Sequence, residues 1–125
     1  MHEDNNPDIY LCALLTEMVT AREGDVSHEF QTVVRLMQRL RDYTEEETLI
    51  LIQSALAMEQ EHDFDTRIAL CKENLDDERL REALGLLAYL ARIDGAVSNA
   101  EEGVFARVCV GLGVTLTGGK VEITR

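Results

Sequence analysis

Asp94, Ser98 and Glu101 carry oxygen atoms at a spacing that could bind a divalent cation. They lie in the stretch ARIDGAVSNAEE, residues 91–102, between two runs of apolar residues at helical spacing. In an EF-hand calcium loop, a glycine stands at position six and a bidentate glutamate at position twelve. With Gly95 at position six, Asp94 falls at five, Ser98 at nine and Glu101 at twelve. The residue types therefore suggest the second half of a calcium loop.

The first half of that loop is missing. The register requires oxygen ligands at positions one and three, where the chain has Leu90 and Arg92. A high-affinity EF-hand is therefore excluded. Ser98 and Glu101 also have the spacing of a capping box, in which each side chain binds a free backbone amide at a helix start. The sequence favours this capped corner and leaves a weak or shared cation site as the alternative.

A similar corner occurs earlier in the chain. REGDVS (22–27) aligns with IDGAVS (93–98), and both copies stand between apolar helical segments. Glu23 and Asp25 give the first copy acidic residues of its own. Phe30 stands where the capping-box glutamate would be, so the two copies are not equivalent. If the two corners meet, Glu23 and Asp25 could join the metal ligands of the second copy.

Other groups are poorly arranged for catalysis. The three cysteines are far apart, have apolar neighbours and form no Cys-x-x-Cys pair, so we expect reduced, buried thiols. EQEHDFD (59–65) contains one Glu-x-x-His spacing, but a di-iron bundle needs a second, and we expect a solvated acidic turn. The sequence contains no G-x-S-x-G elbow, P-loop or His-Glu-x-x-His motif. We therefore expect a protein that is not an enzyme.

The elements that must position these residues are predicted to be helices. Six segments repeat apolar residues about every three or four positions, which predicts one buried face each. Asn6-Pro7 begins the first segment, and the third is expected to end near His62. The predicted N-caps are Ser27, Thr44 (with Glu47 as its box partner), Asp76 or Asp77, and Ser98. The predicted inward residues are Leu11, Leu14, Leu15 and Met18; Phe30, Val33, Val34, Met37 and Leu40; Leu49, Ile52 and Leu56; Phe64, Ile68, Cys71 and Leu75; Leu80, Ala83, Leu84 and Leu87; and Val104, Phe105, Val108 and Leu112.

The predicted fold is an all-α, compact bundle of about six helices with two similar helix–corner–helix units. We expect residues 1–125 to form a single domain, with a core at 7–113. In the tail, 114–125, apolar residues alternate with threonines before two glycines. This pattern predicts a small hairpin or a loose extension.

The charge of the chain restricts its partners. Lys and Arg number 12 against 24 Asp and Glu, a net charge of −12. Such a surface disfavours nucleic acid and anionic lipid and favours cations and basic protein surfaces. No apolar run is long enough to span a membrane, and the N-terminus is acidic and polar, so we expect a cytoplasmic protein without direct membrane insertion.

The two corners and a Gly-Leu-Gly-Val ending resemble the TerB-like family. The matching stretches are 11–18, 23–27, 84–90, 94–98, 101–102 and 111–114, so the resemblance covers about residues 9–114. It implies an all-helical domain linked in bacteria to tellurite resistance and related stress responses. Related domains serve as interaction modules, including one in a membrane-anchored J-domain co-chaperone. Cation binding through acidic residues has been proposed for tellurite-resistance members. Phe30 and the glycine-rich tail depart from the family pattern.

Two functional hypotheses follow. The first is a non-enzymatic stress-response module that docks a basic protein surface through its acidic face, or associates with itself. The second is a divalent-cation-binding protein in which Asp94, Ser98, Glu101, Glu23 and Asp25 supply the ligands. We expect no cofactor to be needed for folding.

Overall fold

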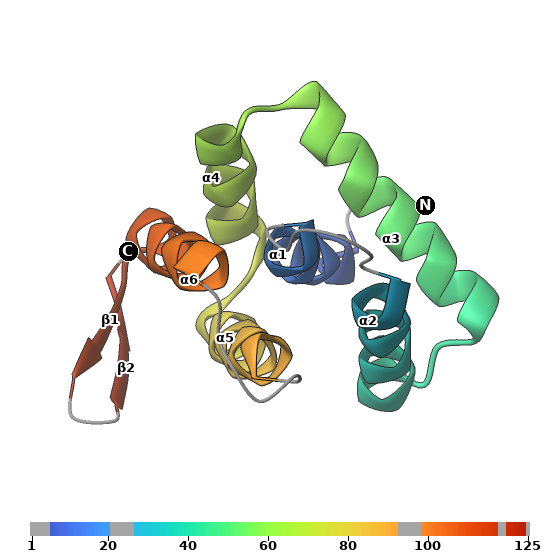
Figure 1. Ribbon diagram of the computed structural model, residues 1–125. Helices are drawn as coiled ribbons and strands as arrows, with labels where there is room; N and C mark the ends of the chain where they lie inside the picture. Colours follow the sequence, from blue (N-terminus) through green and yellow to red (C-terminus); the bar gives the residue numbers. More distant parts are fainter. Residues whose placement is uncertain (1–5, 21–26, 93–98, 118–119, 125) are drawn as a thin grey trace.

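The computed structural model describes residues 6–20, 27–92, 99–117 and 120–124. These residues form a helical bundle with a small hairpin attached (Figure 1). The helices are α1 (Asp8–Thr20), α2 (Ser27–Arg41), α3 (Glu45–Glu61), α4 (Phe64–Asn74), α5 (Asp77–Ala91) and α6 (Asn99–Leu112), and the strands are β1 (Val114–Thr117) and β2 (Lys120–Ile123). The all-α fold predicted from the apolar periodicity is confirmed.

Helix α1 lies at the centre of the bundle and packs against each of the other five helices (Figure 1). Its four predicted inward residues are buried, but so is every other residue from Leu11 to Val19. A helix with neighbours on all sides exposes no face to water. The prediction of one buried apolar stripe therefore gave too few buried residues for α1. The core of the protein is therefore organised around this one helix.

The predicted helix starts at Thr44 and Asp76 are confirmed. The Thr44 hydroxyl accepts a hydrogen bond from the Glu47 amide at 3.1 Å, and the Glu47 carboxylate accepts one from the Thr44 amide at 2.9 Å. Of the two aspartates proposed for α5, Asp76 is the cap and accepts from the Arg79 amide at 2.8 Å. These bonds satisfy amides that the first helical turn leaves unpaired.

The two serines predicted as caps are not placed by the structure. Helix α2 begins at Ser27, but the side chain of Ser27 is not described. Ser98 lies outside the described residues. The capping role of both residues therefore stays a prediction.

Helix α3 buries Ile52 as predicted, but its buried face is shifted from the predicted one. Leu49, expected to point inward, is 44% exposed, and Ile50 is 56% exposed. The buried residues of α3 are Thr48, Leu51, Ile52 and Ala55. The prediction for Leu49 is wrong because the run of four apolar residues at 49–52 spans more than one turn, so some of them must point away from α1. The edge of the bundle therefore keeps exposed apolar side chains.

The tail forms the hairpin that was one of its two predicted conformations. Strands β1 and β2 pair antiparallel, with Val114 opposite Ile123. Gly113 has φ +71, a conformation open to glycine, and its carbonyl accepts from the Thr124 amide at 2.8 Å. Val114 is buried, and β1 packs against α6. The hairpin is therefore held to the bundle at its base.

The described helices contain between 11 and 17 residues each. None of them is both long enough and apolar enough to cross a bilayer.

Candidate functional site

The corner between α2 and α3 is fixed to α1 by a buried carboxylate. Asp8 is 4% exposed; its Oδ2 accepts from the Tyr43 hydroxyl at 2.7 Å and lies 3.3 Å from Arg41 Nε. Arg41 also donates to both carboxylate oxygens of Glu82 on α5, at 2.7 and 3.3 Å. Asp42, between the two partners, adopts a positive φ of 57, which turns the chain sharply after α2. The corner thus becomes a rigid link among α1, α2 and α5.

Two groups of this link, Arg41 and Tyr43, have a raised pKa. The hydrogen bond to Glu82 is the chief cause that raises the pKa of Arg41, which remains a cation. Burial is the chief cause that raises the pKa of Tyr43, whose hydroxyl remains a neutral donor to Asp8. Arg41 and Tyr43 therefore keep the same protonation over the whole neutral range.

A second buried carboxylate on α1 holds α4. Glu17 is 8% exposed and receives two hydrogen bonds from Arg67, at 2.5 Å from Nε and 3.1 Å from Nη2. Arg67 Nη1 also donates to the His62 carbonyl at 2.7 Å, at the end of α3. The hydrogen bond to Glu17 is the chief cause that raises the pKa of Arg67. Such a planar, two-point pairing fixes both position and orientation.

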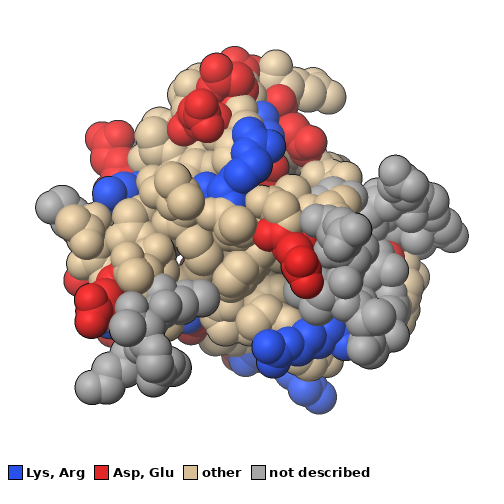
Figure 2. Space-filling view, turned by 60° about the vertical axis from the view of Figure 1, so that its left-hand side comes forward, with Lys and Arg blue, Asp and Glu red and all other residues tan. Residues whose placement is uncertain are grey.

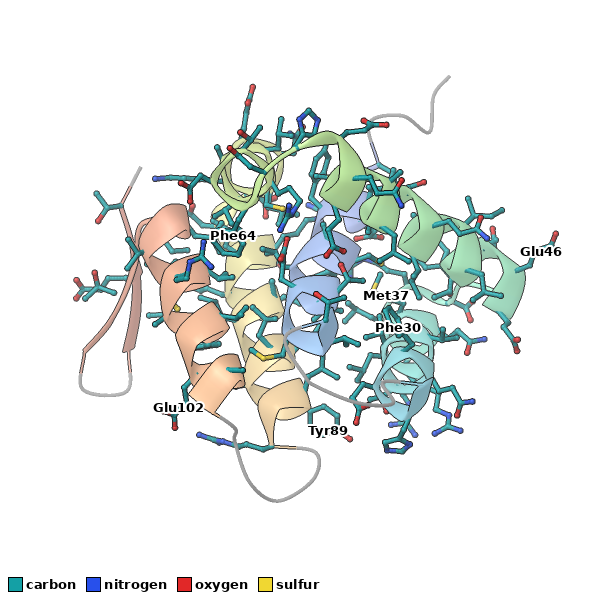
Figure 3. All side chains as sticks on the ribbon, turned by 45° about the horizontal axis from the view of Figure 1, so that its top comes forward. Phe30, Met37, Glu46, Phe64, Tyr89 and Glu102 are labelled. Atoms are coloured by element: carbon teal, nitrogen blue, oxygen red, sulfur yellow. The ribbon has the colours of Figure 1, made fainter. Side chains whose placement is uncertain are left out.

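Between α2 and α3 lies an open groove of about 590 Å³. Its apolar lining comes from Phe30 and Val34 on α2 and from Leu49, Ile52 and Leu56 on α3. Figure 3 shows Phe30 on the side of α2 that faces α3. Only Ile52 of these five is fully buried, while the others are partly buried or exposed. The groove is therefore an unfilled part of the packing between two helices.

Polar side chains border the groove. Arg35, Gln31 and Gln38 lie on the α2 side, and Glu45 and Gln53 on the α3 side. Helix α3 begins with three successive glutamates, Glu45 to Glu47. Figure 3 shows Glu46 at the outer end of α3. An apolar floor with one acidic end can hold an apolar side chain and position a cation beside it.

Sequence periodicity missed this groove because it assigned its apolar residues to the core. Phe30, Val34 and Leu56 have helical spacing, which does not show whether a neighbouring helix covers them. The informative signal is the four-residue apolar run at 49–52, which is too wide for one buried stripe. The two buried carboxylates of α1 were also missed, since they interrupt an otherwise apolar helix without any motif around them.

The three cysteines are free and buried, as predicted. Burial raises the pKa of Cys12 and of Cys71 to about 12, and also raises the pKa of Cys109. At neutral pH all three are protonated thiols, whereas a nucleophile requires the thiolate. Their environment is that of packing residues.

The predicted metal ligands cannot be placed. Glu23, Asp25, Asp94 and Ser98 lie outside the described residues, and the side chain of Glu101 is also not described. The helices that precede the two corners, α1 and α5, are described. Helices α1 and α5 pack together and end on the same side of the bundle (Figures 1 and 3).

Within the described parts of the chain, no three His, Cys, Asp or Glu side chains gather in a way that could hold a metal ion. The stretch 59–65 contains exposed Glu61, Asp63 and Asp65, as expected of a solvated turn. Asp63 has a structural role there, because it accepts from the Thr66 amide at 2.8 Å and caps α4. A hydrogen bond with the Thr66 side chain is the chief cause that lowers the pKa of Asp63, and the bond from the Thr66 amide lowers it further.

Fold and groove together define a small helical-bundle domain with an open surface between two of its helices. The family model described as "Tellurite resistance protein TerB" matches residues 8–117, which is most of the chain. The chain therefore belongs to the TerB family. No curated protein and no solved structure matches the chain significantly.

Proposed function

We propose that this TerB-family chain is a non-enzymatic interaction module of a bacterial stress response, and that it docks a basic, amphipathic helix from a partner protein. The groove between α2 and α3 is the single observation that carries the proposal. Its floor is apolar, it is open, and its walls are fixed to α1 through Asp8. The stress context comes from the family. In this proposal residues 1–125 form one domain, which works in the cytoplasm and folds without a cofactor.

The dimensions of the groove fit a helix. Its lining on α3 runs from Glu45 to Leu56, a span of twelve residues, and the eleven rises between them cover about 17 Å at 1.5 Å each. A partner helix of about three turns covers that length. Helices that bind in such grooves place residues at i, i+3, i+4 and i+7 on the apolar floor. These anchor residues of the partner would contact Phe30, Leu49 and Leu56.

The charges select the flanks of the partner helix. The net charge of the chain is −12, and α3 begins with Glu45, Glu46 and Glu47 beside the end of the groove. On the face shown in Figure 2, acidic and basic groups both border uncharged surface. Lysine or arginine beside an apolar stripe would complement this arrangement and speed the encounter. An acidic helix would be repelled.

The test uses a designed three-turn helical peptide with a leucine stripe and lysine flanks. Titrated into the full, ¹⁵N-labelled chain, it should shift amide signals that cluster on α2 and α3. Leu49→Gln should weaken binding about tenfold, since it removes an apolar contact from the groove. Ile50→Gln is the matched control: Ile50 is the neighbouring exposed residue and does not line the groove.

Two results would contradict the proposal. One is equal weakening by Leu49→Gln and Ile50→Gln, which would indicate nonspecific attraction of a cationic peptide. The other is a dimer of the free protein in sedimentation that Leu49→Gln converts to monomer, because the groove would then serve a second copy of the chain. A peptide with glutamate flanks serves as the charge control.

A divalent cation is the second candidate ligand. It is favoured by the sequence of the two corners, with Glu23 and Asp25 in one and Asp94, Ser98 and Glu101 in the other, and by the shared side on which α1 and α5 end. After removal of metal with EDTA, one cation at about 100 times its Kd should stabilise the fold by about 2.7 kcal/mol. Asp94→Asn with Glu101→Gln should abolish this response.

The stability of that double variant without metal must be measured as well, because the same change removes part of the predicted capping box. Equal small shifts from calcium, magnesium, manganese and zinc would indicate only screening of the net charge. Loss of stability without any change in metal response would leave a capped corner and no metal site.

A further inference from the structure

A second hollow, of about 680 Å³, lies on another side of α2, between α2 and α5. It differs from the groove in its charge. Among its described lining residues are His28, Arg35 and Arg39 from α2 and Tyr89 from α5, and none of them is a carboxylate. Figure 3 shows Tyr89 leaving α5 on the side toward α2. A basic lining is unexpected in a chain with twice as many acids as bases.

The helical spacing brings these groups to one face. His28, Arg35 and Arg39 are seven and four residues apart, which places them along the same side of α2. Arg35 and Arg39 are one turn apart, a rise of about 6 Å, so both guanidinium groups can reach one anionic group between them. Thr32 lies on the same face, but its hydroxyl already donates to the His28 carbonyl at 3.0 Å. The donors that remain are the two arginines, His28, the Gln38 amide and the Tyr89 hydroxyl.

The two arginines of this hollow have no carboxylate partner among the residues that the structure describes. By contrast, Arg41 donates hydrogen bonds to Glu82, and Arg67 donates hydrogen bonds to Glu17. Within the described part of the chain, neither Arg35 nor Arg39 forms an ion pair. Their charge is therefore not neutralised by any described carboxylate.

The negative net charge does not prevent anion binding here. The screening length is about 8 Å at physiological ionic strength, so distant carboxylates contribute little to the potential inside the hollow. Two guanidinium groups one turn apart dominate at short range, and arginine binds phosphate oxygens through paired N–H groups.

We propose that the hollow between α2 and α5 binds a phosphate-bearing anion, with Arg35 and Arg39 sharing its charge and the Tyr89 hydroxyl donating a further hydrogen bond. His28 lies seven residues from Arg35, about 10 Å along α2, which is farther than a single phosphate group spans. The ligand therefore carries more than one phosphate group, and a phosphate chain alone or one attached to a nucleoside satisfies this chemistry.

The experiment is calorimetric titration of the full chain, without magnesium, by orthophosphate, tripolyphosphate and ATP. Tripolyphosphate should bind with one-to-one stoichiometry and more tightly than orthophosphate. Arg39→Gln should weaken it about tenfold or more, since a hydrogen bond to a charged group is worth about 1.5 to 3 kcal/mol. Arg39 does not line the groove proposed for a partner helix, so this variant tests the hollow alone.

Arg81→Gln is the matched control, because Arg81 is an exposed arginine of α5 outside the hollow. It changes the net charge equally and should weaken tripolyphosphate much less than Arg39→Gln does. Tyr89→Phe should weaken it severalfold. Equal affinity for tripolyphosphate and ATP would identify the phosphate chain as the recognised part, and tighter binding of ATP would identify a nucleotide.

Equal weakening by Arg39→Gln and Arg81→Gln would overturn the proposal, because it would show a general response to charge. Absence of saturable binding by all three anions at millimolar concentration would also overturn it. Unchanged thermal melting of the free Arg39→Gln variant confirms that its loss of binding does not come from misfolding.

Discussion

Helix α1 and the edge formed by α2 and α3 use similar apolar residues with opposite results. In α1, Leu14 and Leu15 are completely buried, whereas Leu49 on α3 is 44% exposed. The difference lies in the number of neighbours. Helix α1 packs against five other helices, while α3 lies at the outside of the bundle (Figure 1). Apolar sequence therefore marks the core in one region and an open surface in the other.

The polar residues of the two regions show the same contrast. Asp8 and Glu17 of α1 are buried and tie α1 to its surroundings through Tyr43, Arg41 and Arg67. Such contacts fix the position of α1 through several independent hydrogen bonds. The carboxylates of the edge, such as Glu45, are exposed and remain open to water or to a partner. The buried carboxylates thus hold α1 in place, whereas those of the α2–α3 edge are exposed on the surface.

The largest expected effect comes from the same substitution made in both regions. Leu14→Ala should lower the free energy of unfolding by about 4 kcal/mol, because it leaves a cavity in a fully packed site. Leu49→Ala should cost less than about 1 kcal/mol, since much of that side chain is already in water. Urea unfolding followed by circular dichroism measures both. Equal losses would mean that Leu49 is covered in solution, for instance by a second copy.

The next effect tests the buried carboxylate of α1. Glu17→Gln should destabilise the protein by about 3 kcal/mol, because Arg67 would keep its charge in a site only 12% exposed. The melting temperature should fall by about 10 °C. Exposed Glu46→Gln should change it by less than about 2 °C.

A double variant separates two causes of the stability lost in Glu17→Gln: the unpaired charge of Arg67 and the missing hydrogen bonds. Glu17→Met together with Arg67→Met removes both charges and keeps much of the packing, so it should recover most of the stability lost in Glu17→Gln. No recovery would show that the hydrogen bonds themselves, including that from Arg67 to the His62 carbonyl, contribute most of the energy.

Much of the bundle could be predicted from sequence because its signals are local. Apolar spacing marks each helix, and a capping residue such as Thr44 marks its start; both depend on residues within a few positions. The groove and the hollow depend on which helices lie side by side. Leu49 and Phe30 come from different helices, and nothing in their own neighbourhoods shows that they line one groove. The predicted metal ligands, such as Asp94, remain a prediction from sequence.

A smaller effect is expected where α2 and α3 meet α1. Tyr43→Phe removes the donor that lies 2.7 Å from Asp8 and should cost about 1 to 2 kcal/mol at pH 7. Burial raises the pKa of Tyr43, so the folded state holds the phenolic proton more tightly than the unfolded state does. The stability that this group contributes is complete below the unfolded pKa near 10 and is lost as the pH rises through the folded pKa.

Unfolding of both proteins should therefore be measured from pH 6 to pH 11. The difference between wild type and Tyr43→Phe should be constant up to about pH 9 and shrink above about pH 10. A difference that shrinks on acidification instead would contradict the assignment of the effect to the Tyr43 hydroxyl.

The smallest effect concerns the start of α3, at the acidic end of the groove. Thr44→Ala breaks the capping box with Glu47 and should cost about 1 kcal/mol. Hydrogen exchange should quicken at amides in the first turn of α3 and stay unchanged in α1, because local opening at a helix end needs no unfolding of the core. Glu46→Ala, in the same turn but outside the box, should leave these amides protected. Faster exchange in α1 as well would show that the edge and the centre unfold as one unit, and the contrast between them would then be one of exposure alone.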